Sequence, residues 1–317
     1  MDQPWSSLPP AFLSQLSEII PSDRLPSVLE SFSHERQPSF RINTIKISVA
    51  RALKQLQQEG VSFSPVGWCV EAFLVDEDRK QALLDSPLYQ TGAVYPQSLS
   101  SILAGIVFDP KPLEEILDMC AAPGSKTSHI AALMENKGAI IANDASRGRV
   151  FRLQENLKTL GVLNTKTTCL PGEWLWKKYP GMFDRVLVDV PCSMEGRFVA
   201  TEPETFQDWK PAKGKLLSQK QKYLLRSAVA CAKPGGTILY STCTLNPREN
   251  EEVVDWILRT DEGLVVLDEV NVPEDVLVMD GLTESNKKQF HPDLKKTVRI
   301  LPSEAMEGFF LAKFRKL

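Results

Sequence analysis

The sequence has few of the residues on which metal sites, disulfide scaffolds and membrane spans depend. Its 317 residues include only three histidines and six cysteines, and no two cysteines form a C-x-x-C pair. We therefore expect no bound metal, no disulfide framework, and free thiols in a reducing compartment. No apolar run reaches the length of about 18 residues that a membrane helix requires. Residues 1–5 lack a basic stretch followed by an apolar core, so no secretory signal is predicted.

Two common phosphate-binding patterns are also absent. The G-x-G-x-x-G fingerprint does not occur, and the G-x-x-x-x-G-K-[ST] loop would need a glycine where Ser125 stands. A pyrophosphate or triphosphate ligand is therefore not expected. The formal net charge of -3 argues against indiscriminate binding of nucleic acid, although a local basic groove remains compatible with it. The chain is 43% apolar, enough to bury a full core.

The pattern of predicted elements changes near residue 113. Before it, short helices in residues 1–35 precede a small α+β unit with a helix at 49–58. After it, strands and helices alternate, which predicts an α/β fold with a doubly wound, mostly parallel sheet. The predicted strands of this part are 115–118, 139–142, 165–170, 185–188, 237–240, 297–300 and 308–313. Its helices are predicted at 126–134, 147–160 and 216–232.

A cysteine follows the predicted strand at 237–240. Asn246 is a good N-cap, Pro247 suits a first helical position, and Glu249 completes a spacing similar to a capping box. Cys243 would then lie close to a helix amino terminus, which lowers the pKa of a thiol and favours the thiolate. The sequence thus predicts a nucleophile, with a buried structural cysteine as the alternative.

The turn after the first strand of the alternating part is the place where ligands of such sheets bind. It reads D-M-C-A-A-P-G-S-K from Asp118 to Lys126, with small residues that allow close approach of a ligand. Asp144 ends the next strand, about 20 positions after Gly124, where a carboxylate can accept hydrogen bonds from ribose hydroxyls. A ribose without a pyrophosphate indicates S-adenosylmethionine. Capping of the helix near Arg147 is the alternative role for Asp144.

A second cysteine follows another strand end. Asp189 and Cys192 lie three positions apart in the segment D-V-P-C-S at 189–193. If the strands that precede Cys192 and Cys243 are neighbours in the sheet, both thiols and Asp189 are expected to meet in one crevice.

Three motifs, in this order, resemble a known family. L-D-M-C-A-A-P-G-S-K at 117–126, D-V-P-C-S at 189–193 and S-T-C-T-L-N-P-R-E-N-E at 241–251 are similar to the Nop/Sun family of RNA cytosine-5 methyltransferases. The likeness is greatest to the bacterial type that acts on 16S ribosomal RNA. It implies a seven-stranded, Rossmann-like methyltransferase sheet in a catalytic domain at 91–317. It also implies S-adenosylmethionine as cofactor and an RNA-docking region at 1–90.

The resemblance also implies roles for individual residues. Cys243 matches the nucleophile that adds to carbon 6 of cytosine, and Cys192 matches the cysteine that resolves the adduct. Asp189 matches the carboxylate at the cytosine edge, and Lys126 matches an active-site donor or electrostatic partner. The cofactor-binding residues implied by the motifs are Cys120, Ala121, Ala122, Pro123, Gly124, Ser125, Lys126, Asp144 and Asp189.

The sequence departs from the family pattern at two positions. Pro171 stands where relatives carry an aspartate near the adenine, and Met194 stands where glycine is usual. The sequence also ends soon after the last predicted strand, so we expect RNA to be held by residues 1–112 and by the catalytic groove. Arg41 and Asn43 are candidate substrate contacts, with polar positions on a half-exposed strand as the alternative.

Two lysine runs are further candidate RNA contacts, or else solvated faces. They comprise Lys210, Lys213, Lys215, Lys220 and Lys222, and then Lys287, Lys288, Lys295 and Lys296. Three functions remain open at this point: methylation of RNA, ribosomal or transfer; methylation of DNA with Cys192 attacking; and a non-enzymatic RNA-binding assembly factor. We expect a cytoplasmic protein without a membrane partner, and a monomer is the default because no oligomerisation pattern is visible.

Overall fold

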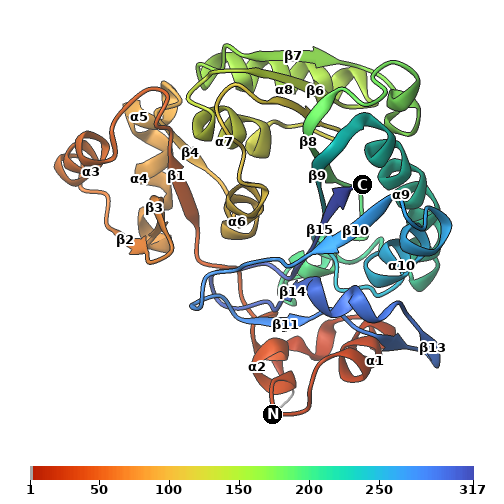
Figure 1. The fold of residues 1–317 in the computed structure, drawn as a ribbon. Coiled ribbons are helices and arrows are strands. Elements are labelled where there is room, and N and C mark those ends of the chain that lie inside the picture. Colours follow the sequence, from red (N-terminus) through yellow and green to blue (C-terminus); the bar gives the residue numbers. More distant parts are fainter. Residues whose placement is uncertain (1–2) are drawn as a thin grey trace.

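The computed structural model describes residues 3–317, which form a large part and a smaller part beside it (Figure 1). Residues 1 and 2, the start of the stretch that bears on a secretory signal, lie outside the described residues. All six cysteines are free. Within residues 3–317, no helix has both the length and the apolar character that crossing a bilayer requires.

The large part is built on a nine-stranded sheet. Its order is β11-β14-β15-β9-β8-β5-β6-β7, and β10 pairs with β15. Strands β5 to β9 are mutually parallel, whereas β15 is antiparallel to β9. The bounds are β5 Glu115–Asp118, β6 Ala139–Asn143, β7 Thr165–Thr168, β8 Phe183–Asp189, β9 Ala232–Thr242, β10 Val265–Asp268, β11 Val278–Asp280, β14 Val298–Ile300 and β15 Phe309–Lys316. The predicted doubly wound α/β fold is confirmed: all seven predicted strands are present, and β10 and β11 extend the sheet.

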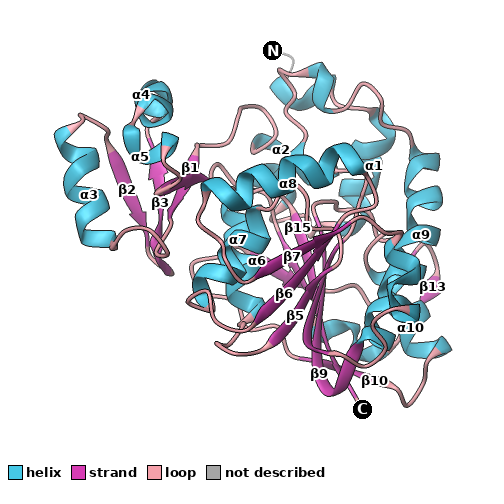
Figure 2. Ribbon diagram, turned by 90° about the horizontal axis from the view of Figure 1, so that it is seen from above, coloured by secondary structure: helices cyan, strands magenta, loops and turns pink. Residues whose placement is uncertain are grey.

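Helices cover both faces of this sheet (Figure 2). α9 and α10 lie on one face, where Leu224 and Val254 join the core with Tyr240 of β9. α6 and α7 lie on the other face, where Ile102 and Ile130 are fully buried. The bounds are α6 Leu99–Phe108, α7 Ser125–Leu133, α8 Arg147–Thr159, α9 Pro211–Cys231 and α10 Glu251–Thr260. Sequence periodicity did not predict α6, because this helix is buried on nearly every side and has no polar face.

The smaller part has its own antiparallel sheet of order β2-β3-β1-β4 and its own core around Phe40 and Phe73. Its strands are β1 Ser39–Ile42, β2 Phe63–Val66, β3 Cys69–Val75 and β4 Val94–Pro96, and its helices are α3 Val49–Gln58, α4 Lys80–Asp85 and α5 Pro87–Gln90. Because β4 pairs with β1, we propose that the boundary between the two parts lies between β4 and α6, a few residues beyond the predicted position at residue 90.

Arg41 and Asn43 link the two parts. The Arg41 guanidinium donates to Gln97 Oε1 at 3.0 Å and to Ser128 Oγ at 3.2 Å, and Ser128 belongs to α7. Asn43 Nδ2 donates to the carbonyl oxygen of Leu160, at the end of α8. Both side chains are about 1% exposed. The expectation that they touch substrate or point to solvent is therefore wrong, since each is used to dock the small sheet.

The first two helices do not belong to the small sheet. α1 (Pro10–Ile19) and α2 (Leu25–Glu30) lie against the large part, next to β11 and β14 (Figure 1). Phe12 and Phe32 pack with Phe198, which follows the Cys192 loop, and with Leu245, which follows Cys243. The amino-terminal helices thus support the loops that carry both cysteines.

Candidate active site

The two cysteines meet at the carboxyl edge of the sheet. Asp189, the last residue of β8, is in register with Ser241 of the parallel neighbour β9. Cys192 and Cys243 follow these strand ends, and their Sγ atoms lie 3.3 Å apart. The predicted convergence of both thiols and Asp189 is confirmed, because two neighbouring parallel strands deliver their ends to the same place.

Lys126 is fixed beside Asp189. Its Nζ donates to Asp189 Oδ2 at 2.8 Å and to Ser101 Oγ at 3.1 Å, and it lies 5.5 Å from the Phe309 ring centroid. Ser241 Oγ donates to Asp189 Oδ1 at 2.8 Å. Both carboxylate oxygens are therefore held, so the carboxylate has one orientation. Lys126 is only 7% exposed, and the ion pair compensates the cost of burying its charge.

The segment after Cys243 differs from the predicted helix start. α10 begins at Glu251, and residues 247–250 form a turn in which Asn246 Oδ1 accepts from the Arg248 N–H at 3.1 Å. Glu249 does not close a capping box. Its carboxylate accepts from the Ser193 N–H at 3.0 Å and from Gln221 Nε2 at 2.9 Å. The prediction of a helix terminus next to Cys243 is wrong, because Glu249 binds the Cys192 loop instead.

The thiolate of Cys243 is favoured by other means. A hydrogen bond from Cys192 lowers the pKa of Cys243, and the positive charge of Arg197 lowers it further, against the opposing effect of burial. The same hydrogen bond, with burial, raises the pKa of Cys192 well above its usual value. Of the two thiols, Cys243 is therefore the one that loses its proton more readily.

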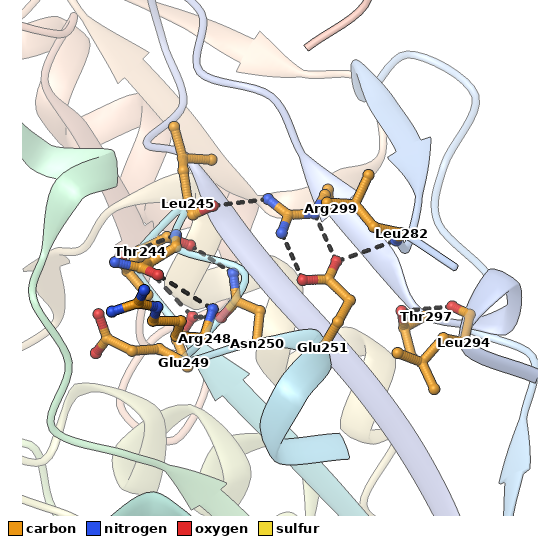
Figure 3. A network of polar contacts seen from close by, with 12 residues as sticks. Thr244, Leu245, Arg248, Glu249, Asn250, Glu251, Leu282, Leu294, Thr297 and Arg299 are labelled. Carbon is orange, nitrogen blue, oxygen red and sulfur yellow. Dashed lines mark hydrogen bonds and ion pairs between the residues drawn. The ribbon is translucent and has the colours of Figure 1, made fainter. Parts of the chain in front are cut away.

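Buried polar groups hold both loops. The Glu195 carboxylate accepts from Trp209 Nε1 at 3.0 Å, Asn246 Nδ2 at 3.0 Å and Gln15 Nε2 of α1 at 2.8 Å. Burial raises the pKa of Glu195. On the other side, Arg299 pairs with Glu251 and donates to the Leu245 carbonyl oxygen at 2.9 Å (Figure 3).

A cavity of about 380 Å³ opens in front of the cysteine pair. It is lined by all four predicted catalytic residues and by most of the predicted cofactor-binding ones. The lining residues are Ser101, Asp118, Cys120, Ala121, Ala122, Pro123, Ser125, Lys126, Arg149, Asp189, Val190, Pro191, Cys192, Met194, Arg197 and Cys243. Gly124 and Asp144 are outside this set. Gly124 shapes the turn with φ 105°, and Asp144 Oδ2 lies 3.3 Å from Arg149 while Oδ1 accepts from the Ser146 N–H at 3.0 Å.

Sequence reasoning missed three charged residues of the cavity, namely Asp118, Arg149 and Arg197. Asp118 is 1% exposed, and its Oδ1 is buried without a hydrogen-bond partner, whereas Oδ2 accepts from Thr127 Oγ1 at 2.7 Å. Burial, opposed by the Thr127 hydrogen bond, raises the pKa of Asp118 to about 7. Its position at the end of β5 was the available signal. For Arg197 the sequence contains no such signal, because a single arginine after a strand looks like a surface residue.

The structure shows the conformation and surroundings of Met194 and Pro171, the two residues that depart from the family pattern. Met194 has φ 63° and is 46% exposed at the rim of the cavity. This left-handed conformation explains why glycine suits the position, since a side chain is disfavoured there. Pro171 is exposed and lines a different cavity. Because its side chain has no carboxylate, Pro171 cannot make the contact that an aspartate would make at this position.

The doubly wound sheet, with the cavity at its carboxyl edge, is the fold of Rossmann-like methyltransferases, a class that uses S-adenosylmethionine. Residues 105–315 match the family described as 16S rRNA methyltransferase RsmB/F, and the chain belongs to this family. Residues 8–99 match the N-terminal domain of 16S rRNA methyltransferase RsmF.

Individual proteins resemble the chain over almost its whole length. Ribosomal RNA small subunit methyltransferase F of Salmonella agona (strain SL483) is 38% identical over 98% of this chain and 63% of the relative. The chain thus spans about 63% of the length of such curated relatives. A methyltransferase homolog from Pyrococcus horikoshii is 32% identical, with a TM-score of 0.81 over 98% of this chain and 100% of that chain. NSun6 from the same organism, solved with SFG, is 22% identical with a TM-score of 0.80 over 98% of each chain, and supports the fold alone.

Proposed function

We propose that this protein methylates carbon 5 of a cytosine in small-subunit ribosomal RNA, with S-adenosylmethionine as methyl donor. One observation carries the proposal: a sulfur with a lowered pKa and a sulfur with a raised pKa lie 3.3 Å apart in a cavity that also contains a lysine–carboxylate pair. Carbon 5 of cytosine is a weak nucleophile, so such a site must first add a thiolate to the ring.

Cys243 is the nucleophile in this scheme. Its thiolate forms a bond to carbon 6 of the cytosine, and the electron pair displaced from the double bond makes carbon 5 nucleophilic. Arg197, which lines the same cavity, stabilises the thiolate before attack. Asp189 contacts the cytosine edge and holds a proton at ring nitrogen 3, and Lys126 keeps the carboxylate oriented for that contact.

Cys192 acts in product release. The proton on carbon 5 is removed after methylation, the bond between carbon 6 and Cys243 breaks, and Cys243 leaves with the bonding electrons as a thiolate. A water molecule takes up this proton, and Cys192, which keeps its own proton, stabilises the departing Cys243 thiolate by hydrogen bonding to it. In this scheme Cys243 therefore attacks the base, and Cys192 assists the release of the product.

The residues of the cavity fit the proposed cofactor. The small residues from Ala121 to Pro123 leave room along the turn, and Asp118 offers a buried, unpartnered oxygen to a positively charged group. When bound, S-adenosylmethionine supplies an electrophilic methyl group. The side chains of Arg149 and Ser125 complete the wall of the site, and Asp144 remains the proposed partner of the ribose.

The proposed substrate is ribosomal RNA, and transfer RNA is the alternative. A target base in a helix must be turned out to reach the cysteines, which costs about a few kcal/mol. We further propose that the protein acts in the cytoplasm and as a monomer.

The deciding experiment is methyl transfer from labelled S-adenosylmethionine to RNA from cells that lack the modification, followed by mapping of 5-methylcytosine. We expect wild type to modify one position in 16S RNA and Cys243→Ala to modify none, although this variant still binds cofactor. Transfer by Cys243→Ala but not by Cys192→Ala would reverse the roles of the two cysteines. The absence of transfer to naked RNA and to ribosomal subunits would refute the proposed activity.

A further inference from the structure

A group of exposed aromatic side chains lies next to α9 on the large part. Trp174, Trp176 and Tyr223 are 62%, 44% and 56% exposed, and all three line one cavity of about 470 Å³. We call these three residues the aromatic platform. The chain has six tryptophans, and the two exposed ones are both in this group. Large exposed aromatic groups that gather at one place indicate a binding surface.

The platform is rigidly attached to the large part. Trp174 and Trp176 belong to a 3-10 helix at Gly172–Lys177, which is anchored by the fully buried Leu175. Gly172 approaches α9 so closely that a Cβ atom would lie 2.5 Å from Leu224 Cδ2. Ser227 Oγ of α9 donates to the Gly172 carbonyl oxygen at 2.8 Å and accepts from the Trp176 N–H at 3.3 Å. The two indoles are thus exposed on a segment whose backbone is fixed.

Positive charge accompanies the aromatic rings. Lys177 Nζ lies 5.4 Å from the Trp174 ring centroid and 5.7 Å from that of Trp176. Lys220 of α9 contributes a second cation, because its Nζ is 4.0 Å from Glu173 Oε1. The remaining carboxylate oxygen, Glu173 Oε2, is buried without a hydrogen-bond partner. The surface therefore offers stacking faces and cations for a phosphate.

One buried side chain links the cofactor turn to the chain segment just before the platform. Asn143 Nδ2 donates to the carbonyl oxygens of Met119 at 3.1 Å and of Leu170 at 2.9 Å, so this one side chain joins the cofactor turn to the residue before Pro171. Pro171 is the first residue of the cavity that the platform lines. The backbone that leads into the platform is therefore fixed to the cofactor turn.

We propose that the aromatic platform binds an unpaired nucleobase of the RNA substrate, by stacking on Trp174 and Trp176 with a neighbouring phosphate at Lys177 or Lys220. This inference rests on the proposed function, because it deepens the description of the same substrate. Single-stranded RNA is held in this way, with bases on aromatic rings and the backbone on cations.

RNA fits this surface better than a protein partner does. A protein interface with exposed aromatic residues usually has an apolar centre that excludes charge. Here a lysine contacts both indoles, a second lysine lies at the edge, and a carboxylate is inside the cavity. This mixture of flat rings and separate charges suits a nucleotide, which presents a flat base and a phosphate.

The test compares RNA affinity among variants of the full chain. A fluorescein-labelled, unstructured RNA dodecamer is titrated with wild type and with the double variant Trp174→Ala/Trp176→Ala, and fluorescence anisotropy is measured. Base stacking on aromatic rings is worth enough to predict a weakening of about 10- to 100-fold. The variant Trp174→Phe/Trp176→Phe should retain most of the affinity. Phe151→Ala is the matched control, because Phe151 is 64% exposed on α8.

A second readout separates this inference from the proposed activity. If wild type transfers methyl groups to RNA, the double alanine variant should raise KM for RNA and leave kcat and cofactor affinity unchanged. Equal RNA affinity and equal KM in wild type and double variant would overturn the inference while leaving the methyltransferase proposal intact, and the surface would then be assigned to a protein partner. A loss equal to that of Phe151→Ala would overturn it as well. Failure of wild type to methylate any RNA bears on the proposed function alone, since the affinity comparison is still made.

Discussion

Removal of the buried arginine behind the Cys243 loop is expected to destabilise the protein strongly. Arg299 and Glu251 are both fully buried, and Arg299 contacts Glu251 through two nitrogens, Nε and Nη2 (Figure 3). In Arg299→Met the Glu251 carboxylate loses this partner inside the core. It keeps only the Leu282 N–H, at 3.2 Å. Loss of one member of a buried ion pair costs about 3–5 kcal/mol.

The size of this effect can be measured by thermal unfolding. Each kcal/mol lowers the melting temperature of a domain of this size by about 2–3 °C, so Arg299→Met should lower it by roughly 6–15 °C. The matched control is Arg315→Met. Arg315 also pairs with a carboxylate, Asp268, at 3.2 Å, but the two side chains are 48% and 33% exposed. Exposed pairs contribute about 0–1 kcal/mol, so this variant should melt close to wild type.

Two outcomes would contradict this reasoning. One is an equal, small shift in Arg299→Met and Arg315→Met. The other concerns the double variant Arg299→Met/Glu251→Leu, in which no charge is left unpaired. It should recover much of the lost stability, because a buried pair replaced by apolar residues costs little. If the double variant is less stable than Arg299→Met alone, the unpaired carboxylate is not the cause. Because Arg299 also binds the Leu245 carbonyl oxygen, methyl transfer by folded Arg299→Met should fall.

Two further predictions concern the cysteine pair. Cys192→Ala should accumulate a covalent complex between protein and RNA, visible on a denaturing gel and absent when Cys243 is also replaced; no complex, with cofactor bound, would remove Cys192 from product release. The lowered pKa of Cys243 predicts that its alkylation by iodoacetamide rises with pH at values below the usual thiol range. Since loss of the Arg197 charge raises this pKa, Arg197→Met should move the rise to higher pH, as judged by peptide mapping with the exposed Cys169 as internal reference; an unchanged profile would exclude an effect of Arg197.

The meeting of Cys192 with Cys243 was predictable because it depends on strand order alone. Each cysteine follows an apolar strand, and neighbouring parallel strands end at one edge. The origin of the low pKa was not predictable. Asn246, Pro247 and Glu249 satisfy the local rules for a helix start, but Glu249 gains more by binding the Ser193 N–H and Gln221 across the fold. A tertiary contact overrides a local propensity here.

Other parts of the molecule carried too little signal in the sequence. α6 has no polar face, and a helix buried on all sides lacks the period by which helices are recognised. Arg41 and Asn43 alternate with apolar residues as on a half-exposed strand, yet their partners come from distant α7 and α8. Trp174 and Trp176 look like core residues, because only the packing of Leu175 and Gly172 determines that the indoles face outward.

The place of β15 in the sheet affects the order in which the protein can fold during synthesis. β15 follows every other described strand in the chain, yet it lies inside the sheet between β9 and β14. Just before it, Gly308 donates to the Gly196 carbonyl oxygen at 3.2 Å, in the loop after Cys192. A chain under synthesis therefore exposes an open edge on β9 until residues 309–316 have been added. The loop after Cys192 lacks this contact before that moment, so we expect the site to be completed only when β15 has paired with β9.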